Sequence, residues 1–220
     1  MTDKYEFVPG DEITIAPGRT VKRIRALVAI ADFGVAAGDV GGYIEKVENL
    51  AVYGNAWVSG DAWVYGDAWV YGNAWVSGDA QVSGDARVYG NAQVSGNAQV
   101  YGDARVSGDA RVYGNAWVSG DAQVSGNAQV YGDARVYGNA WVSGDAQVSG
   151  NAQIVWFSKV GRDNGTLTVF KDKDGQLLAT RGRFIGTIDA FLSKSETEHD
   201  DKTHLEYRLL IEVAYSRLTK

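Results

Sequence analysis

Between residues 49 and 154, hydrophobic and polar positions follow a six-residue unit that repeats without an insertion. The unit reads Asn or Asp, Ala, a variable residue, Val, Ser or Tyr, and Gly. Its Val recurs at every sixth position from Val52 to Val148, and Ile154 takes the next such position. A period of two places Ala and Val on one side of a short strand and the variable and Ser/Tyr positions on the other. Each of the eighteen hexads therefore predicts one strand with an Ala/Val inner side.

The Gly of each hexad, followed by Asn or Asp, predicts a sharp corner. Gly tolerates positive φ, and Asn and Asp bond their own backbone, so the chain turns every six residues. A single hexad cannot bury its Ala/Val side alone, whereas stacked coils bury it continuously. The repeat therefore predicts a parallel coil of strands and not a glycine-rich disordered tract.

These hexads resemble the hexapeptide-repeat left-handed β-helix superfamily, whose coils are triangular and hold three hexads each. The resemblance implies a mainly β fold with a parallel, left-handed, triangular β-helix of about six coils, roughly 29 Å tall at about 4.8 Å per stacked strand. The flanks resemble one narrower group, the uncharacterised hexapeptide-repeat proteins of enteric bacteria and their phages that are labelled transferases. The segments that carry this likeness are Arg23–Leu27, Gly38–Glu45, Gly165–Val169, Phe184–Thr187 and Glu206–Arg208.

The segment before the repeat, residues 1–48, breaks the six-residue period but keeps strand-like runs at Glu12–Ala16 and Val21–Ile30. An uncovered coil end exposes unpaired strand edges that invite polymerisation. We therefore expect residues 1–48 to form an N-terminal β cap. Lys22, Arg23 and Arg25 lie on one of its strands, where a solvated basic face is favoured over a phosphate contact.

The segment after the repeat, residues 155–220, predicts a small α+β domain that closes the other end. Thr166–Phe170 and Gln176–Thr180 flank an Asp174-Gly175 turn and predict a hairpin. Thr187 predicts the N-cap of a helix that runs to about Lys194. A second helix is predicted from an apolar stripe that comprises Leu205, Leu209, Leu210, Val213, Ala214 and Leu218.

Composition narrows the classes of function. The chain has no cysteine, which excludes disulfides, thiolate nucleophiles and cysteine-ligated metals. Its net charge is -6, and residues 49–154 hold nine Asp against four Arg with no Lys or Glu, so direct nucleic-acid binding is not expected. No apolar run has membrane-spanning length, and Met1–Gly10 lacks the features of a signal peptide. We expect a protein of the bacterial cytoplasm or one associated with a virion, without a membrane contact.

Catalysis is not expected. Acyltransferases of the resembled superfamily use a histidine on the coil or on a loop that leaves it, and their carbonic-anhydrase-like relatives need three histidine ligands. This chain has only His199 and His204, both in the tail, and its hexads leave no loop to wall an active site. We therefore predict no catalytic residue, no cofactor and no metal.

A column of stacked carboxylates is a candidate cation-binding site. With three hexads per coil, residues eighteen apart lie above one another, which aligns Asp67, Asp85, Asp103 and Asp121. Carboxylates about 4.8 Å apart repel and favour cation capture. Asp61 over Asp79 is the only other stacked Asp pair, and this total is close to what chance placement gives. Solvated turn carboxylates are the favoured interpretation.

Outward-facing aromatic residues crowd the first coils. They are Trp57, Trp63, Trp69 and Trp75 with Tyr53, Tyr65 and Tyr71. Only Trp57 and Trp75 are eighteen apart, so the four tryptophans ring the prism and do not form a stripe. A ring favours burial under the N-terminal segment or a contact between subunits, and binding of a carbohydrate or a partner protein is the alternative.

Three functions follow as hypotheses. The first is a noncatalytic phage or prophage scaffold that binds a host or phage protein or a glycan, as a homotrimer of the kind common among left-handed β-helices. The alternatives are an acidic inhibitor that mimics nucleic acid and an acyltransferase with an atypical site. We expect the specific function at the irregular ends and at the tryptophan-rich first coils.

Overall fold

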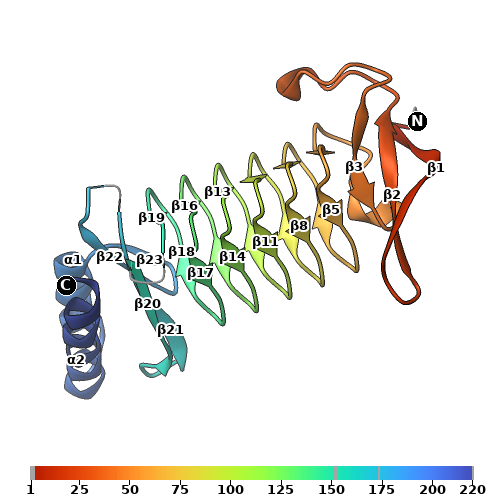
Figure 1. The fold of residues 1–220 in the computed structure, drawn as a ribbon. Coiled ribbons are helices and arrows are strands. Elements are labelled where there is room, and N and C mark those ends of the chain that lie inside the picture. The colour runs from red at the N-terminus through yellow and green to blue at the C-terminus, as the bar shows by residue number, and fades with distance from the viewer. Residues whose placement is uncertain (1–2, 151–152, 173, 220) are drawn as a thin grey trace.

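The computed structural model describes residues 3–150, 153–172 and 174–219. It is a mainly β protein with a parallel β-solenoid of about six turns, followed by a small antiparallel sheet and two helices (Figure 1). This confirms the predicted fold class. Asn151 and Ala152, which open the last predicted hexad, lie outside the described residues.

Each regular hexad contributes a strand of two residues, the variable position and Val. The strands are β4 (Trp57–Val58), β5 (Trp63–Val64), β6 (Trp69–Val70), β7 (Trp75–Val76), β8 (Gln81–Val82), β9 (Arg87–Val88), β10 (Gln93–Val94), β11 (Gln99–Val100), β12 (Arg105–Val106), β13 (Arg111–Val112), β14 (Trp117–Val118), β15 (Gln123–Val124), β16 (Gln129–Val130), β17 (Arg135–Val136), β18 (Trp141–Val142) and β19 (Gln147–Val148).

The strands stack into three parallel sheets, which we call faces. Face A holds β5, β8, β11, β14 and β17; face B holds β4, β7, β10, β13, β16 and β19; face C holds β6, β9, β12, β15 and β18. On face B, for example, Val94 lies between Val76 and Val112. Neighbours in a sheet are thus eighteen residues apart, which confirms three hexads per coil.

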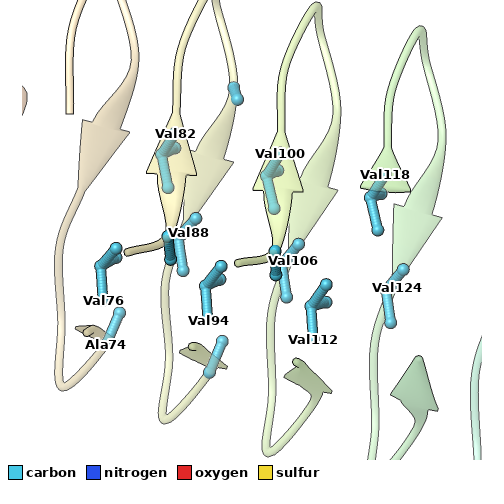
Figure 2. Packing of buried hydrophobic residues seen from close by; sticks show 14 of the residues in the cluster. Ala74, Val76, Val82, Val88, Val94, Val100, Val106, Val112, Val118 and Val124 are labelled. Atoms are coloured by element: carbon cyan, nitrogen blue, oxygen red, sulfur yellow. The ribbon is translucent and has the colours of Figure 1, made fainter. Parts of the chain in front are cut away.

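The interior is built almost entirely from the repeat Ala and Val. Every repeat Ala from Ala56 to Ala146 and every repeat Val from Val58 to Val148 is at most 1% exposed. The Val side chains of successive coils point toward the same axis (Figure 2). A fully buried Val stabilises the fold by roughly 1.5–3 kcal/mol, and each Val is buried only when its coil has neighbouring coils. The coils are therefore stable only as a stack.

The corner glycines from Gly54 to Gly144 adopt positive φ, between +61° and +72°. They also stack closely: a Cβ on Gly102 would lie 3.0 Å from the backbone nitrogen of Gly120. The corner needs glycine for its backbone conformation and for its lack of a side chain.

Side chains next to these glycines form amide columns along the corners. Asn73 donates to Asn91 and Asn91 to Asp109, at 3.2 and 2.9 Å. Asn97, Asn115 and Asp133 repeat the arrangement. Each chain of donors ends at an Asp because a carboxylate only accepts.

The N-terminal cap extends face A beyond the regular coils. Its β1 (Tyr5–Ala16) and β2 (Arg19–Ala26) are antiparallel, and β2 also pairs with β3 (Val40–Ile44). In turn β3 runs parallel to β5. Short 3-10 helices η1 (Ala31–Phe33) and η2 (Val47–Asn49) complete the cap. The predicted cover over the first coil is thus a sheet that continues one face of the solenoid.

The first hexad departs from the predicted register. Val52, placed inside by the repeat pattern, is 47% exposed, and Leu50 is fully buried in its place with a parallel bridge to Val70. Leu50 and Val70 are twenty residues apart, whereas partners in later coils are eighteen apart. The backbone N–H of Asn55 donates to the carbonyl oxygen of Gly72 with the regular spacing, so the two additional residues lie between Leu50 and Asn55. The larger Leu fills the end of the interior beside the cap, and the prediction of a regular hexad at 49–54 is wrong.

A buried lysine anchors the cap to the first regular coil. Lys4 is 3% exposed, and its Nζ donates to the carbonyl oxygen of Ala56 at 2.7 Å. Burial lowers the pKa of Lys4 from 10.5 to about 8. The folded protein therefore loses this proton at lower pH than the unfolded chain does.

We predict that this lysine makes stability rise with pH. Between pH 8 and 10.5 the unfolded chain binds more protons than the folded protein, so deprotonation favours folding. From pH 7 to 9.5 the unmodified protein should gain about 2 kcal/mol relative to Lys4→Met. Guanidinium unfolding of both proteins at the two pH values measures the difference. Parallel pH profiles would rule out a desolvated Lys4.

The C-terminal domain closes the opposite end. An antiparallel sheet of β20 (Ile154–Val160), β21 (Gly165–Lys171), β22 (Leu177–Arg181) and β23 (Phe184–Thr187) precedes α1 (Ile188–Glu198) and α2 (Asp201–Leu218). The sheet lies between the solenoid and α2 (Figure 1). Its Thr168 and Thr180 hydroxyls bond the backbone of Trp141 in β18, at 3.0 and 2.7 Å. The predicted hairpin and the Thr187 N-cap are confirmed.

The buried side of α2 confirms half of the predicted stripe, because Ala214 and Leu218 are buried and Leu210 packs beside them. The other half is wrong: Leu205, Leu209 and Val213 are 43–50% exposed, while Tyr207 and Ile211 are buried against the sheet. The Tyr207 ring packs on Phe191 and turns the helix toward that row. No helix in the described parts of the chain is long and apolar enough to cross a membrane.

Candidate functional site

The predicted tryptophan ring is distributed over all three faces. Trp57 and Trp75 are neighbours on face B, Trp63 lies on face A and Trp69 on face C. Trp57 is 1% exposed, and the other three are partly buried.

The cap covers the face B part of the ring. Trp57 belongs to one core cluster with Tyr5 and Ile24 of the cap. Phe33 packs on Trp75 with ring centroids 5.0 Å apart, and Trp75 Nε1 donates to Ser59 at 2.8 Å. These two tryptophans therefore have structural partners within the chain.

Among the remaining predicted aromatic residues, Tyr65 also meets the cap, since the Arg19 guanidinium lies 5.4 Å over its ring. Trp69 stacks on Tyr71 at 4.0 Å, and Tyr71 stacks on Tyr89 of the next coil at 4.9 Å. Tyr53 is 61% exposed. A contact of these residues with a partner or another subunit stays a prediction.

The predicted carboxylate column lies along the corner after face A. Asp67, Asp85, Asp103 and Asp121 are all exposed, one coil apart. The Lys46 ammonium group donates to Asp67 at 2.6 Å and lowers the pKa of that carboxyl. No group of three or more His, Asp or Glu in the described ranges is arranged to hold a metal ion. A cation in this column stays a prediction.

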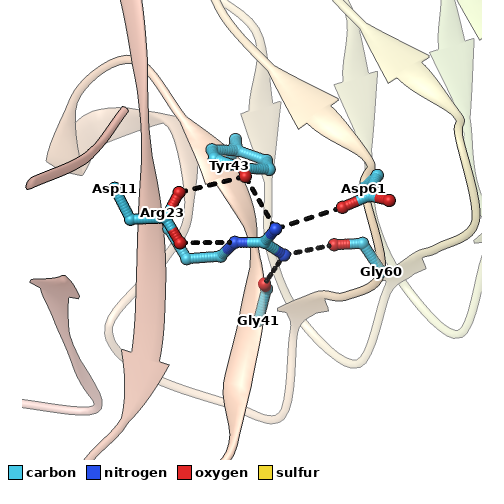
Figure 3. Close-up of polar contacts among 6 residues, drawn as sticks. All are labelled: Asp11, Arg23, Gly41, Tyr43, Gly60 and Asp61. Atoms are coloured by element: carbon cyan, nitrogen blue, oxygen red, sulfur yellow. Dashed lines mark hydrogen bonds and ion pairs between the residues drawn. The ribbon is translucent and has the colours of Figure 1, made fainter. Parts of the chain in front are cut away.

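Arg23, from the basic cluster of Lys22, Arg23 and Arg25, is a structural centre of the cap (Figure 3). Its side chain is 19% exposed, and its guanidinium lies 4.1 Å over the Tyr43 ring. The groups that accept its hydrogen bonds are Asp11 Oδ2 (3.2 Å), the carbonyl oxygens of Gly41 and Gly60 (3.0 Å each), the Tyr43 hydroxyl (2.6 Å) and Asp61 Oδ1 (3.1 Å). Burial raises the pKa of Tyr43, as does its hydrogen bond to Asp11. Arg23 thus joins the three cap strands to the corner before β5, which fits neither a solvated face nor a free phosphate contact.

A cleft opens where face A meets the C-terminal domain. It has a volume of about 780 Å³. Its lining residues are Tyr101, Trp117, Ser119, Arg135 and Tyr137 from face A, Ile154, Val155 and Trp156 from β20, and Arg217 from the last turn of α2. Four aromatic rings and two guanidinium groups therefore surround one space.

Contacts within the cleft hold its aromatic walls in place. Trp156 meets Tyr137 edge to face, with centroids 4.4 Å apart. On the solenoid side, Tyr101 contacts Trp117 at 6.5 Å and the Arg135 guanidinium lies 4.7 Å over the Trp117 ring. Tyr101 and Tyr137 are 36% and 53% exposed, so ring surface remains open to a ligand.

The sequence pattern did not single out these residues. The Tyr/Ser position of face A alternates Tyr65, Ser83, Tyr101, Ser119 and Tyr137 at eighteen-residue spacing, and this signal was available. The contribution of Trp156 and Arg217 was not, because it depends on how the tail packs on the last coils.

The two histidines lie away from this cleft. His204 Nδ1 is 3.3 Å from the Ser195 hydroxyl, and His199 packs beside the Tyr207 ring. His199 also lines a second cavity of about 640 Å³ between α1 and the β22–β23 turn, together with Arg181, Arg183 and the Lys194–Glu198 ion pair. The structure brings neither histidine to the solenoid faces.

Comparison with known protein families matches the repeat itself. The YdcK Beta solenoid repeat matches residues 52–66, 80–96, 98–111, 104–120, 110–126 and 128–144, which together cover about a third of the chain. No curated protein matches the chain. The three stacked faces and this match together make the chain a β-solenoid repeat protein, with a repeat similar to that of YdcK.

Proposed function

We propose that this β-solenoid repeat protein is a noncatalytic scaffold that binds a glycan in the cleft between face A and the C-terminal domain. The observation that carries the proposal is the set of four aromatic rings and two arginines around one cavity. Aromatic rings stack on the apolar faces of sugar rings, and the arginine and hydroxyl groups bond sugar hydroxyls.

The size of the cleft favours a glycan over a protein partner. Its volume of about 780 Å³ falls within the range of small-ligand sites, roughly 300–1,000 Å³. A stable protein interface instead needs about 800 Å² from each partner. A short run of sugars matches the space better than a protein surface does.

The cleft is also fixed before a ligand arrives. Tyr137 and Trp156 come from the solenoid and from β20 and already touch, and Arg135 is held over Trp117. A site whose walls are ordered in advance loses less freedom on binding. This supports a binding function for the junction.

A glycan array followed by calorimetry tests the proposal. Trp156→Ala should weaken binding at least about tenfold, because it removes one wall of the cleft. Tyr113→Ala is the matched control, since Tyr113 occupies the Tyr/Ser position on face B and stacks on Tyr131. The control should bind as the unmodified protein does. Because Trp156 packs against the solenoid core, melting curves check that both variants are folded at the temperature of the binding measurement.

Two results would count against a glycan cleft. One is an array on which the unmodified protein retains no glycan, neutral or acidic. The other is a Trp156→Ala variant with unchanged affinity. A phage origin, a protein partner, a homotrimeric state and the two alternative functions stay predictions.

A further inference from the structure

A smaller cavity lies next to the cleft on face A. It has a volume of about 240 Å³ and is lined by Tyr65, Gln81, Ser83, Gln99 and Tyr101. Tyr101 also lines the cleft, so the two cavities meet at this residue. Together they follow face A from β5 to the C-terminal domain.

Tyrosines occur on this face at every second coil. Backbone hydrogen bonds from Tyr65, Ser83, Tyr101 and Ser119 to the next coil place these residues in one column that ends at Tyr137. Successive tyrosines are thus about 9.6 Å apart and the column spans about 19 Å, at about 4.8 Å per coil. Serines between them leave each ring without a stacked neighbour.

The other two faces are different. Tyr71 and Tyr89 on face C stack at 4.9 Å, and Tyr113 and Tyr131 on face B stack at 5.0 Å. A ring covered by its neighbour offers less surface to a ligand. The alternation with serine is therefore specific to the face that carries the cavities.

Polar groups beside the middle of the tyrosine column are neutral or acidic, and the cations lie at its two ends. There the Arg19 guanidinium lies 5.4 Å over the Tyr65 ring, and Arg135 and Arg217 line the cleft. Gln81 and Gln99 offer amides beside the rings. The carboxylate column of Asp67, Asp85, Asp103 and Asp121 follows the same coils, two residues after each Tyr or Ser. Carboxylates accept hydrogen bonds from hydroxyl groups and repel anions. The middle of the groove therefore suits a chain of neutral sugars and not a polyanion, while the arginines at its ends can donate to sugar hydroxyls.

We propose that face A binds a linear, neutral polysaccharide that lies along the solenoid axis. One end of the polysaccharide lies in the cleft, and every second sugar ring lies over a tyrosine. The length that one sugar ring adds to an extended chain is close to one coil, so alternate rings meet a tyrosine. This rests on the proposed glycan function and adds the shape, charge and direction of the ligand.

A length series tests the inference. The probes are the dimer, tetramer and hexamer of β-1,4-linked glucose, mannose and N-acetylglucosamine, measured by calorimetry. For the series that binds, the hexamer should bind at least tenfold more tightly than the dimer. Polygalacturonate, a linear acidic chain, should bind more weakly than the neutral hexamer.

Variants locate the chain on face A. Tyr65→Ser, which installs the residue that the repeat itself uses at this position, should remove most of the hexamer's advantage and leave dimer affinity unchanged. Tyr101→Ser should weaken tetramer and hexamer alike, and Tyr113→Ser on face B should change neither. Melting temperatures check that each variant folds.

The outcomes separate this inference from the proposed function. Equal affinity for dimer and hexamer, or an unchanged hexamer affinity in Tyr65→Ser, would overturn the linear chain and leave the glycan cleft standing. Preference for polygalacturonate would overturn a neutral ligand. If no member of the three series binds while the array detects another glycan, the extended neutral chain is wrong; if the array is also empty, both proposals fall.

Discussion

Arg23→Met should lower the free energy of unfolding by about 3 kcal/mol, the range expected when one partner of a partly buried charged network is removed. The substitution keeps much of the aliphatic length but removes every donor of the guanidinium. The carbonyl oxygens of Gly41 and Gly60 lose their side-chain donor, and the Asp11 carboxylate loses its cation. The cap would lose its side-chain bonds to the corner before β5 but keep the pairing of β3 with β5 and contacts elsewhere on the first coils, such as the Lys4 bond to Ala56.

Arg25→Met is the matched control because Arg25 lies on the same strand. Its side chain is 40% exposed and pairs with Glu6 at 2.7 Å. An exposed pair of this kind contributes at most about 1 kcal/mol. Urea unfolding compares the two variants, and hydrogen exchange in β1–β3 should rise only in Arg23→Met. Equal losses in both variants would show that the network contributes no more than a surface ion pair.

Leu50→Ala should destabilise the protein by about 3 kcal/mol, since it removes a fully buried side chain from the interior beside Val70. Val52→Ala should change stability by at most about 0.5 kcal/mol because Val52 is 47% exposed. The regular hexad pattern predicts the opposite order.

The two alanine variants therefore decide the register of the first coil. Guanidinium unfolding measures both, and Val58→Ala provides the reference for a repeat position that is buried under either register. A larger loss for Val52→Ala than for Leu50→Ala would restore the uninterrupted repeat. Val58→Ala should destabilise in every case.

The regular part of the fold could be predicted because each hexad carries the same information. Positive φ at Gly, the inner position of Val and the stacking of residues eighteen apart recur from coil to coil. The structure predicted for one coil therefore applies to the other regular coils. Local chemistry also sufficed for the Asp174-Gly175 turn and for the Thr187 cap, because their partners lie within a few residues.

The ends could not be predicted in the same way. Arg23 binds groups as far away as Asp61, and Leu50 takes the inner position expected for Val52 by bridging to Val70. The buried row of α2 depends on where Tyr207 meets Phe191. In each case the deciding contact joins segments whose distance in the sequence carries no periodic signal.

The candidate groove could be predicted in part, less fully than the regular repeat and more fully than the ends. The alternation of Tyr65, Ser83 and Tyr101 can be found in the sequence once three hexads form a coil. The cleft needs Trp156 and Arg217 as well, and their place beside Tyr137 follows from the packing of the tail. The tryptophan ring predicted a specific function at the first coils, where part of the ring is packed under the cap.

The threefold arrangement of hexads limits how this protein can change in length. Gain or loss of eighteen residues adds or removes one coil and returns the chain to the same face, so the cleft would keep both of its walls. Gain or loss of a single hexad would preserve the backbone pairing of the repeat but deliver β20 and Trp156 to a neighbouring face. Recombination between near-identical hexads would then produce folded chains without the candidate cleft, whereas deletions or duplications of whole coils would keep it.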